Sequence, residues 1–355
     1  MKTHQVQQKT ERRISAALRL VFVAALLLGQ IALAFFLSTE LRQRAAIIYT
    51  VLELAAFGYA VRIYNRTDGA SYKFGWIFLV LTVPVVGLIL YFLWNGDRQQ
   101  KRLDLKKLPM PEEPEAQQAA HRIQMEKLRR KFPQWERLSV YLSRQGYLLY
   151  GDTETTYLPT GEAFLQDMLE KLEQAEHFIF MEFFIIAQGQ VWDRMEEIFR
   201  RKAAEGVEVK IIFDDFGSMM RFPAGQIEAL RESGVEVQIF NPVHHYVNRL
   251  YFNYRDHRKI VCIDGSTAYT GGANVADEYA NLTVRFGYWK DCGIRLDGPG
   301  AWGLTREFLH MWQRNGGQLM QERDYYRPHD HREAAGFCQP FVDGPDNNPI
   351  STAED

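Results

Sequence analysis

The sequence predicts an α/β fold that follows an apolar amino-terminal region, and two patterns support this prediction. Three long apolar runs lie within residues 1–97. From residue 158 onward, segments with helical periodicity alternate with strand-like apolar segments, and this alternation indicates βαβ units. A chain of 355 residues is long enough for a membrane anchor and one sizeable globular domain.

The apolar runs are Leu20–Leu37, Ala45–Val61 and Phe74–Trp94. The third is predicted as the clearest membrane span, because about twenty apolar residues cross the hydrocarbon core and Pro84 is tolerated there. The second is the weakest candidate because it contains Glu53. The first follows basic residues and ends near Ala-Leu-Ala, so a cleaved signal peptide is an alternative to a span. We therefore expect two to three transmembrane helices in residues 1–97.

A basic cluster directly after the third run favours a cytoplasmic location for the rest of the chain, in a multi-pass protein of the cell membrane. The cluster either contacts anionic lipid headgroups or is a solvated linker, and both interpretations stay open. Residues 98–135 are predicted as a linker that contains a charged helix. The members of the cluster are Arg98, Lys101, Arg102, Lys106 and Lys107.

The globular part is predicted to cover residues 136–335. Residues 177–186 form a near-continuous apolar run, which is typical of a strand that is covered on both faces. The other elements follow from periodicity and from Gly and acidic residues near helix ends. We expect helices within 158–177, 191–206, 224–234 and 302–312, and further strands within 207–215, 235–240 and 288–296.

The chemistry-bearing pattern lies in the segment NYRDHRKIVCIDGSTAYTGGAN, which has the form of a strand, a turn and a second strand. In an extended strand, residues two apart share a face, so His257 and Lys259 point the same way. Asp264 falls on the other face within an Asp-Gly hairpin signal, so we interpret it as structural. Six intervening residues separate Asp264 from the pair Gly271 and Gly272, and Asn274 then completes the pattern.

These residue types suit phosphoryl chemistry. A lysine ammonium stabilises charge on phosphate oxygens, and a neutral imidazole can attack phosphorus and carry the phosphoryl group covalently. Asn274 adds an amide donor. The alternative is a polar face of a surface strand, but the Gly-Gly-x-Asn at fixed distance favours catalysis.

The segment resembles the HxKx4Dx6G[GS]xN motif of the phospholipase D superfamily. Residues 274–279 (NVADEY) and 288–300 (YWKDCGIRLDGPG) are similar to bacterial cardiolipin synthases in particular. The resemblance implies a phospholipase-D-type α/β sandwich half, in which His257, Lys259, Asp264 and Asn274 are the motif residues. Members of this kind carry two such motifs, whereas this chain has one, and residues 336–355 resemble the opening of a second half that is missing.

The resemblance implies a membrane-bound phosphatidyltransferase. One phosphatidylglycerol would donate its phosphatidyl group to a histidine, and a hydroxyl of a second would resolve the phosphohistidine to give cardiolipin. The mechanism needs two histidines, one as nucleophile and one as general acid and base. His257 supplies one, so the other would come from a homodimer or a separate second half. The alternatives are a homodimeric phospholipase D or phosphodiesterase and a non-catalytic truncated half-protein.

The expected partners are phosphatidylglycerol, other phospholipids and the membrane. A formal net charge of -2 argues against nucleic acid as a partner. We predict no cofactor and no metal. Asp214 and Asp215 could form a metal pair, but no further carboxylate or histidine stands at a spacing that supports one. The three cysteines, Cys262, Cys292 and Cys338, have no paired spacing, which favours a reducing compartment.

Several further residues are candidates for the site. Asp291 either accepts a hydrogen bond from His257 Nδ1 or is an ordinary acid at a strand edge, and it joins the candidate catalytic set. Glu182, inside an apolar strand, needs a partner such as Lys259 or the phosphate-binding network, although a structural salt bridge is an equal alternative. Gly271, Gly272 and Arg255 are the other candidate substrate-binding residues.

Two more groups near the motif leave alternatives open. Asp277 and Glu278 either cap a following helix, which is the favoured interpretation, or accept a hydrogen bond from a substrate hydroxyl. A basic and aromatic loop precedes the motif and either contacts headgroups or is interfacial. Its residues are His244, His245, Tyr246, Arg249 and Arg255.

Overall fold

The structure is a computed structural model that describes residues 42–66, 70–94, 114–243, 255–319, 322–327 and 334–344, with Ala25, Leu28, Gly29 and Ala32. The chain divides into two compact units, an amino-terminal helical unit and the globular unit. Three predicted features lie outside the described residues: most of the first apolar run, the basic cluster after residue 97, and the loop residues 244–249.

The amino-terminal unit contains the helices α2 (Arg42–Tyr64), α3 (Ala70–Thr82) and α4 (Pro84–Trp94). Within the described residues, one stretch is long and apolar enough to cross a membrane, Ile47–Tyr64. It belongs to the second apolar run, which the sequence ranked weakest. Most of its side chains are exposed, as expected of a helix that faces lipid rather than a protein core.

The third apolar run, predicted as one span, is instead broken into α3 and α4. Pro84 is the first residue of α4, where its missing N–H and fixed φ are favourable, and the helix before it ends at Thr82. The chain bends so sharply that a Cβ on Gly87 would lie 2.5 Å from the Leu79 carbonyl oxygen. The rings of Trp76 and Tyr91, one from each helix, meet edge to face at 5.5 Å.

The globular unit is built on a seven-stranded mixed sheet in the order β1-β7-β6-β5-β2-β3-β4. The neighbours β2, β3 and β4 are parallel, and the remaining pairs are antiparallel. The predicted α/β class is confirmed. The strands are β1 (Glu154–Leu158), β2 (Phe178–Phe183), β3 (Glu208–Asp214), β4 (Glu236–Phe240), β5 (Ile260–Ile263), β6 (Thr267–Gly271) and β7 (Gly293–Asp297).

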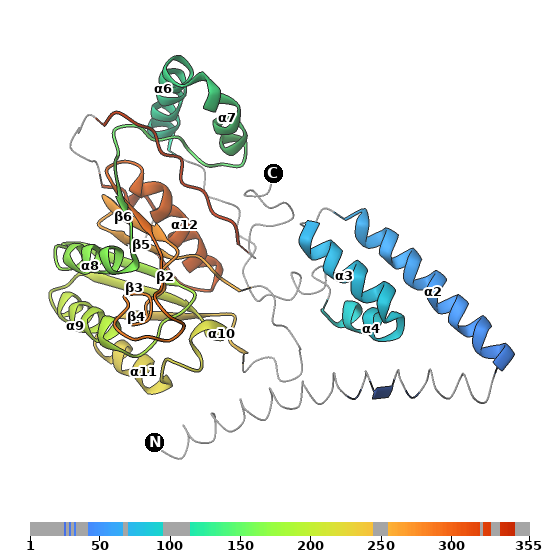
Figure 1. Ribbon diagram of the computed structural model, residues 1–355. Helices are drawn as coiled ribbons and strands as arrows, with labels where there is room; N and C mark the ends of the chain where they lie inside the picture. Colours follow the sequence, from blue (N-terminus) through green and yellow to red (C-terminus); the bar gives the residue numbers. More distant parts are fainter. Residues whose placement is uncertain are drawn as a thin grey trace. The chain divides into compact units, whose positions relative to one another are not determined.

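Helices cover both faces of the sheet. Figure 1 shows α8, α9 and α11 together on one side of the sheet and α12 on the other. All six residues of β2 are buried, which confirms the prediction of a strand covered on both faces. Ile179, Met181 and Phe183 belong to the core beneath α8 and α9, whereas Phe180 stacks on Phe308 of α12 at 4.9 Å. The helices are α8 (Gly161–Leu172), α9 (Gln190–Ala204), α11 (Ala224–Glu232) and α12 (Ala301–Arg314).

Three further helices belong to the globular unit. The short α10 (Asp215–Ser218) follows β3, while α6 (Glu115–Lys131) and α7 (Glu136–Arg144) precede β1. The helix predicted inside the linker is α6, and it packs on the globular unit. Trp302 Nε1 donates to Gln117 Oε1 at 3.0 Å, and Leu149 N donates to His121 Nδ1 at 2.9 Å.

The turn between β5 and β6 confirms the predicted Asp-Gly hairpin. Asp264 and Gly265 both have positive φ, at 53° and 67°, and Ser266 N donates to Ile263 O at 3.1 Å. Positive φ at both central residues is the type I′ geometry, whose twist matches that of the flanking strands. Aspartate tolerates this conformation better than most residues because its short side chain bonds locally.

Candidate active site

Several strand ends meet at one edge of the sheet. Because β5 is antiparallel to β2 and β6, and β6 to β7, the start of β5 lies at the same edge as the ends of β2 and β6 and the start of β7. His257 and Lys259 were predicted inside a strand, but β5 begins only at Ile260, so they lie in the extended segment that leads into it. Asp291 likewise precedes β7 rather than lying within it.

His257 and Lys259 are in direct contact. Lys259 Nζ lies 3.0 Å from His257 Nδ1 and donates to the His257 carbonyl oxygen at 2.6 Å. An ammonium can only donate, so Nδ1 accepts and the proton of the neutral ring is on Nε2. The Phe184 ring lies 4.9 Å from the imidazole and 5.7 Å from Nζ, which places both groups against one aromatic surface.

The surroundings affect the charge states of both groups. Partial burial, and then the charge of Lys259, lowers the pKa of His257 from its ordinary value, although Asp256 opposes the shift. Burial lowers the pKa of Lys259 to about 8, against the opposing charges of Asp256 and Asp291. At neutral pH the imidazole is therefore mainly neutral and the amine mainly charged.

Asp291 lies against the Gly-Gly pair. Its Oδ1 accepts from Cys292 N at 2.8 Å, and its Oδ2 accepts from Trp289 Nε1 at 3.2 Å. A Cβ on Gly272 would collide with Asp291 Oδ1, so only glycine admits the carboxylate at this place. The contact at His257 Nδ1 is made by Lys259, so the predicted hydrogen bond from Nδ1 to Asp291 stays a prediction.

Asn274 connects two segments of the site. Its Oδ1 accepts from Ile185 N at 3.0 Å, and its Nδ2 donates to Tyr279 Oη at 3.0 Å. The residue is 3% exposed. Its amide thus ties the segment after β2 to the segment after β6, and the predicted donation to phosphate oxygens would require that Nδ2 rearrange.

Asp264 lies at the opposite end of β5 and accepts three backbone N–H groups. Its Oδ1 accepts from His177 N and Phe178 N, both at 2.7 Å, and its Oδ2 accepts from Glu176 N at 2.8 Å. The carboxylate therefore fastens the turn after β5 to the start of β2. This geometry agrees with the structural interpretation of Asp264.

Sequence reasoning missed Arg258, which forms a buried ion cluster behind the motif. Its Nε lies 2.8 Å from Glu182 Oε1 and 3.1 Å from Asp256 Oδ1, and all three residues are buried. Burial opposes ionisation of Asp256, yet Arg258 and the hydrogen bonds around the carboxyl hold the pKa of Asp256 below its ordinary value. Strand alternation was the available signal, because it turns Arg258 away from His257 and Lys259 into the protein, where a cation needs an acid. Glu182 thus forms an ion pair with Arg258, which corresponds to the structural salt bridge that the sequence left as an alternative.

Arg255 and Asp214 hold the chain just before the motif. Arg255 Nη1 donates to Asn241 O at 2.8 Å and to Asp214 Oδ1 at 3.3 Å, and Asp214 Oδ2 accepts from Asp256 N at 3.0 Å. Burial raises the pKa of Asp214 to about 7, although Arg255 and backbone N–H groups oppose the shift. Arg255 is thus engaged with the protein in this structure, and its predicted contact with substrate stays a prediction.

The two acids after the motif have separate roles. Asp277 accepts from Gln190 N and Val191 N at 3.1 and 3.0 Å, so it caps α9 rather than a following helix. Glu278 forms a bidentate ion pair with Arg221 at 2.5 and 2.6 Å. The prediction that both residues cap the next helix is therefore wrong.

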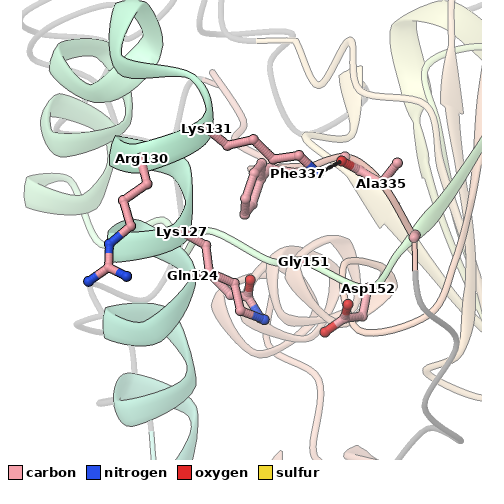
Figure 2. A pocket seen from close by; sticks show the side chains of 10 residues that line it. Gln124, Lys127, Arg130, Lys131, Gly151, Asp152, Ala335 and Phe337 are labelled. Atoms are coloured by element: carbon pink, nitrogen blue, oxygen red, sulfur yellow. Dashed lines mark hydrogen bonds between the residues drawn. The ribbon is translucent and has the colours of Figure 1, made fainter.

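A cavity of about 470 Å³ opens beside Lys259. Its walls include Ile260, Thr270 and Ile294, and the segment Phe337–Asp343 contributes the facing side. Figure 2 shows a different depression, between α6 and the segment around Phe337, in which Lys131 donates to Ala335 O at 3.2 Å. No motif residue lines that depression, whereas Lys259 of the motif lines the cavity of about 470 Å³.

Comparisons with known proteins give family matches for two segments of the chain. Residues 168–284 match the family model described as cardiolipin synthase, PLD-like domain, and residues 54–95 match the phospholipase D–nuclease N-terminal model. The chain is 31% identical to cardiolipin synthase 2 of Bacillus anthracis over 83% of this chain and 57% of that protein. An uncharacterized protein of Streptococcus mutans is 35% identical over 76% of this chain and 59% of its own length.

Among solved structures, Nuc from Salmonella typhimurium, a phospholipase D family member, matches at 17% identity with a TM-score of 0.34, over 46% of this chain and 94% of that one. The chain spans somewhat more than half the length of the two curated relatives. The motif segment falls inside the family match at residues 168–284. The chain therefore carries a PLD-like domain of the phospholipase D superfamily at residues 168–284, and bacterial cardiolipin synthases are among its relatives.

Proposed function

We propose that this protein is a membrane-bound phosphatidyltransferase of the cardiolipin synthase kind, which moves a phosphatidyl group between phosphatidylglycerol molecules through a phosphohistidine on His257. The observation that carries the proposal is the contact of 3.0 Å between Lys259 Nζ and His257 Nδ1 at the glycine-lined edge of the sheet. It pairs a neutral nucleophile with a phosphate-binding cation. The relatives named cardiolipin synthase support the choice of substrate.

The first step needs a change of tautomer. Nε2 can attack phosphorus only when it carries the lone pair, which requires the ring proton on Nδ1. Lys259 must therefore leave Nδ1 and move to the non-bridging phosphate oxygens. Asp291, held against Gly272, is the proposed acceptor of the hydrogen bond that Nδ1–H donates. Its charge also favours the cationic form of Lys259.

Transfer then proceeds through two displacements. His257 Nε2 bonds to phosphorus as the bond to the glycerol oxygen breaks, and that oxygen must receive a proton. A hydroxyl of a second phosphatidylglycerol next attacks the phosphohistidine and loses its proton, which restores His257. One histidine cannot be nucleophile and general acid in the same step, so we propose that a second copy of the chain or a second half supplies the other histidine.

The location of the reaction follows from the amino-terminal unit. Ile47–Tyr64 would anchor the protein in the membrane, where its substrate resides. We propose a multi-pass anchor and a cytoplasmic catalytic domain. The basic residues that follow the third apolar run support that orientation.

The test is to express the full chain in membranes with phosphatidylglycerol that is labelled in the phosphatidyl group. Wild type is compared with His257→Ala and with the matched control His177→Ala, whose exposed side chain lies away from the site. Labelled cardiolipin from wild type and His177→Ala, but not from His257→Ala, supports the proposal. An acid-labile label on the wild-type protein supports the phosphohistidine.

The other products separate the competing functions. Labelled phosphatidic acid in place of cardiolipin indicates hydrolysis, as in a phospholipase D. Product formation by His257→Ala rejects the proposal. So does the absence of labelled product from a folded and membrane-inserted wild type, both alone and after addition of a separately expressed second half.

A further inference from the structure

An exposed apolar loop follows the motif. All residues from 282 to 288 are exposed, and the apolar ones alternate with Thr283, Arg285 and Gly287. Isolated apolar residues are normal on a protein surface, but four in seven consecutive residues indicate a contact surface. Their exposed fractions are 50% for Leu282, 86% for Val284, 73% for Phe286 and 68% for Tyr288.

The base of the loop is fixed, so its exposure is part of a defined conformation. Asn281 Nδ2 donates to Trp289 O at 2.9 Å, and Trp289 N donates to Asn281 Oδ1 at 2.7 Å. The same Nδ2 donates to Glu162 Oε1 of α8 at 2.7 Å. Asn281 adopts a positive φ of 51°, which asparagine tolerates. These bonds clamp the two ends of the loop together, and its apolar tip extends from this clamp.

One side of the loop is also held by charge. Arg285 Nη1 lies 3.1 Å from Glu278 Oε1, and Glu278 is already paired with Arg221. Two guanidinium groups thus share one carboxylate at this side of the loop, while Glu162 and Asp291 lie at its clamp. Arg285 is itself a loop residue, and a cation at this place can contact a lipid phosphate.

The loop arises at the edge of the sheet that carries the candidate site. Trp289 at its base donates to Asp291, and Asp291 contacts Gly272. The Tyr279 ring lies 4.8 Å from the Trp289 ring, and Tyr279 binds Asn274. The clamp is therefore connected to the motif by two chains of contacts, one through Asp291 to Gly272 and one through Tyr279 to Asn274.

We propose that residues 282–288 enter the headgroup and upper acyl region of an anionic bilayer and bring the edge with His257 to its lipid substrate. The proposal deepens the proposed function and rests on it for the substrate. Exposed aliphatic and aromatic side chains that alternate with an arginine are typical of segments that lie in the membrane interface. A protein surface, in a second copy or a second half, is the competing occupant.

The test uses the full chain in vesicles that contain phosphatidylglycerol. In a background of Cys292→Ser and Cys338→Ser, in which the remaining Cys262 is fully buried, Val284→Cys is labelled with an environment-sensitive fluorophore. The matched control is Glu232→Cys, exposed at the end of α11. Lipids with a spin label high on the acyl chain serve as quenchers.

We expect quenching to remove about half or more of the emission at position 284 and almost none at position 232. Adding Leu282→Ser and Phe286→Ser should reduce quenching at 284 at least twofold without lowering the melting temperature, because both side chains are exposed. Equal quenching at 284 and 232 overturns the proposal. So does a blue shift at 284 that grows with protein concentration in detergent, since it indicates a protein partner.

The same measurement in a His257→Ala background separates this inference from the proposed function. Retained quenching shows that the loop enters lipid whether or not the chain is active. A chain that makes no cardiolipin but is quenched at 284 contradicts the proposed function and leaves the loop assignment standing. A chain that makes cardiolipin but is not quenched at 284 supports the proposed function and contradicts the loop assignment.

Discussion

Asp264 provides the sharpest test of how the motif divides between structure and chemistry. Its carboxylate accepts three backbone N–H groups at 2.7 to 2.8 Å, and its φ is 53°. Hydrogen bonds to a charged group contribute about 1.5–3 kcal/mol each when buried. Two of the three are exposed and one is part-buried, so about 1 kcal/mol each is appropriate. Alanine at a left-handed φ costs about 1 kcal/mol more.

We therefore expect Asp264→Ala to lower the free energy of unfolding by about 4 kcal/mol. For a domain of this size that corresponds to a fall in melting temperature of roughly 10 °C. Asp264→Asn keeps one acceptor oxygen and tolerates the positive φ, so it should lose only about 1–2 kcal/mol.

The assay pairs thermal unfolding in detergent with labelling of His257 per folded molecule at a temperature where each variant is native. Both Asp264 variants should label as wild type does, whereas His257→Ala should melt as wild type does and not label. An Asp264→Ala protein that melts normally but fails to label would refute the structural assignment of this aspartate.

Four other perturbations test the site and its support. Gly272→Ala should displace Asp291 and reduce phosphohistidine formation at least tenfold, with a small change in melting temperature. Gly271→Ala should instead mainly destabilise the sheet, because its Cβ would lie 2.7 Å from the Cys292 carbonyl oxygen. The pKa of His257 is lowered, and the proposed nucleophile is its neutral ring. The rate of His257 labelling should therefore stay constant as pH falls to the ordinary pKa of histidine and decline only below it. A decline that begins above that pKa contradicts the assignment of His257 as a neutral nucleophile. Arg221→Met should lower stability by about 2 kcal/mol at neutral pH. The Glu278 pKa is lowered, so this difference from wild type should vanish as pH falls through the folded-state pKa of Glu278 in unfolding titrations. The folded-state pKa of Asp214 is raised from 3.8 to about 7, so wild type should lose stability as pH rises across that window. Asp214→Asn should remove this pH dependence, which amounts to up to about 4 kcal/mol. Parallel curves of stability against pH for wild type and Asp214→Asn would exclude the raised pKa.

The globular fold was predictable because its signals are local. The helices and strands from α8 to β4 follow from periodicity and from near-continuous apolar runs, and the Asp264–Gly265 turn follows from its sequence. The strand β1 was missed because ETTYL is short and mostly exposed. It is a strand only because it pairs with β7, which lies more than a hundred residues away. Pairing over that distance leaves no local pattern.

The amino-terminal helices show where composition misleads. Phe74–Trp94 has the composition of one span, but Pro84 begins a new helix and the chain turns back over α3 at Gly87. The prediction treated proline as a tolerated residue within a helix. Hydropathy averages over the run and cannot register that the two halves contact each other.

Side-chain partners in the site were the least predictable part. For Glu182 the sequence left open a contact with Lys259, one with the phosphate-binding network, and a structural salt bridge, and the structure shows an ion pair with Arg258. Alternation along the strand gives the direction of Arg258, but the neighbour of β5 in the sheet is known only from the fold. The sequence identifies which residues are unusual, and the register decides which of them meet.

The motif thus separates into groups that fix the backbone and groups that remain available for substrate. Asp264, Asn274 and Arg258 make their described contacts with the protein, and these contacts hold the ends of β2, β5 and β6 together. His257 is exposed, and its described side-chain partner is Lys259. Lys259 cannot hold the phosphate oxygens and also give a proton to the leaving alkoxide, since losing that proton would remove the charge that stabilises the transition state. A scaffold with one His–Lys pair can therefore place a nucleophile against phosphorus, but rapid formation of the phosphohistidine requires a second acid that protonates the leaving alkoxide in the same step. For this reason the proposed activity depends on a second histidine.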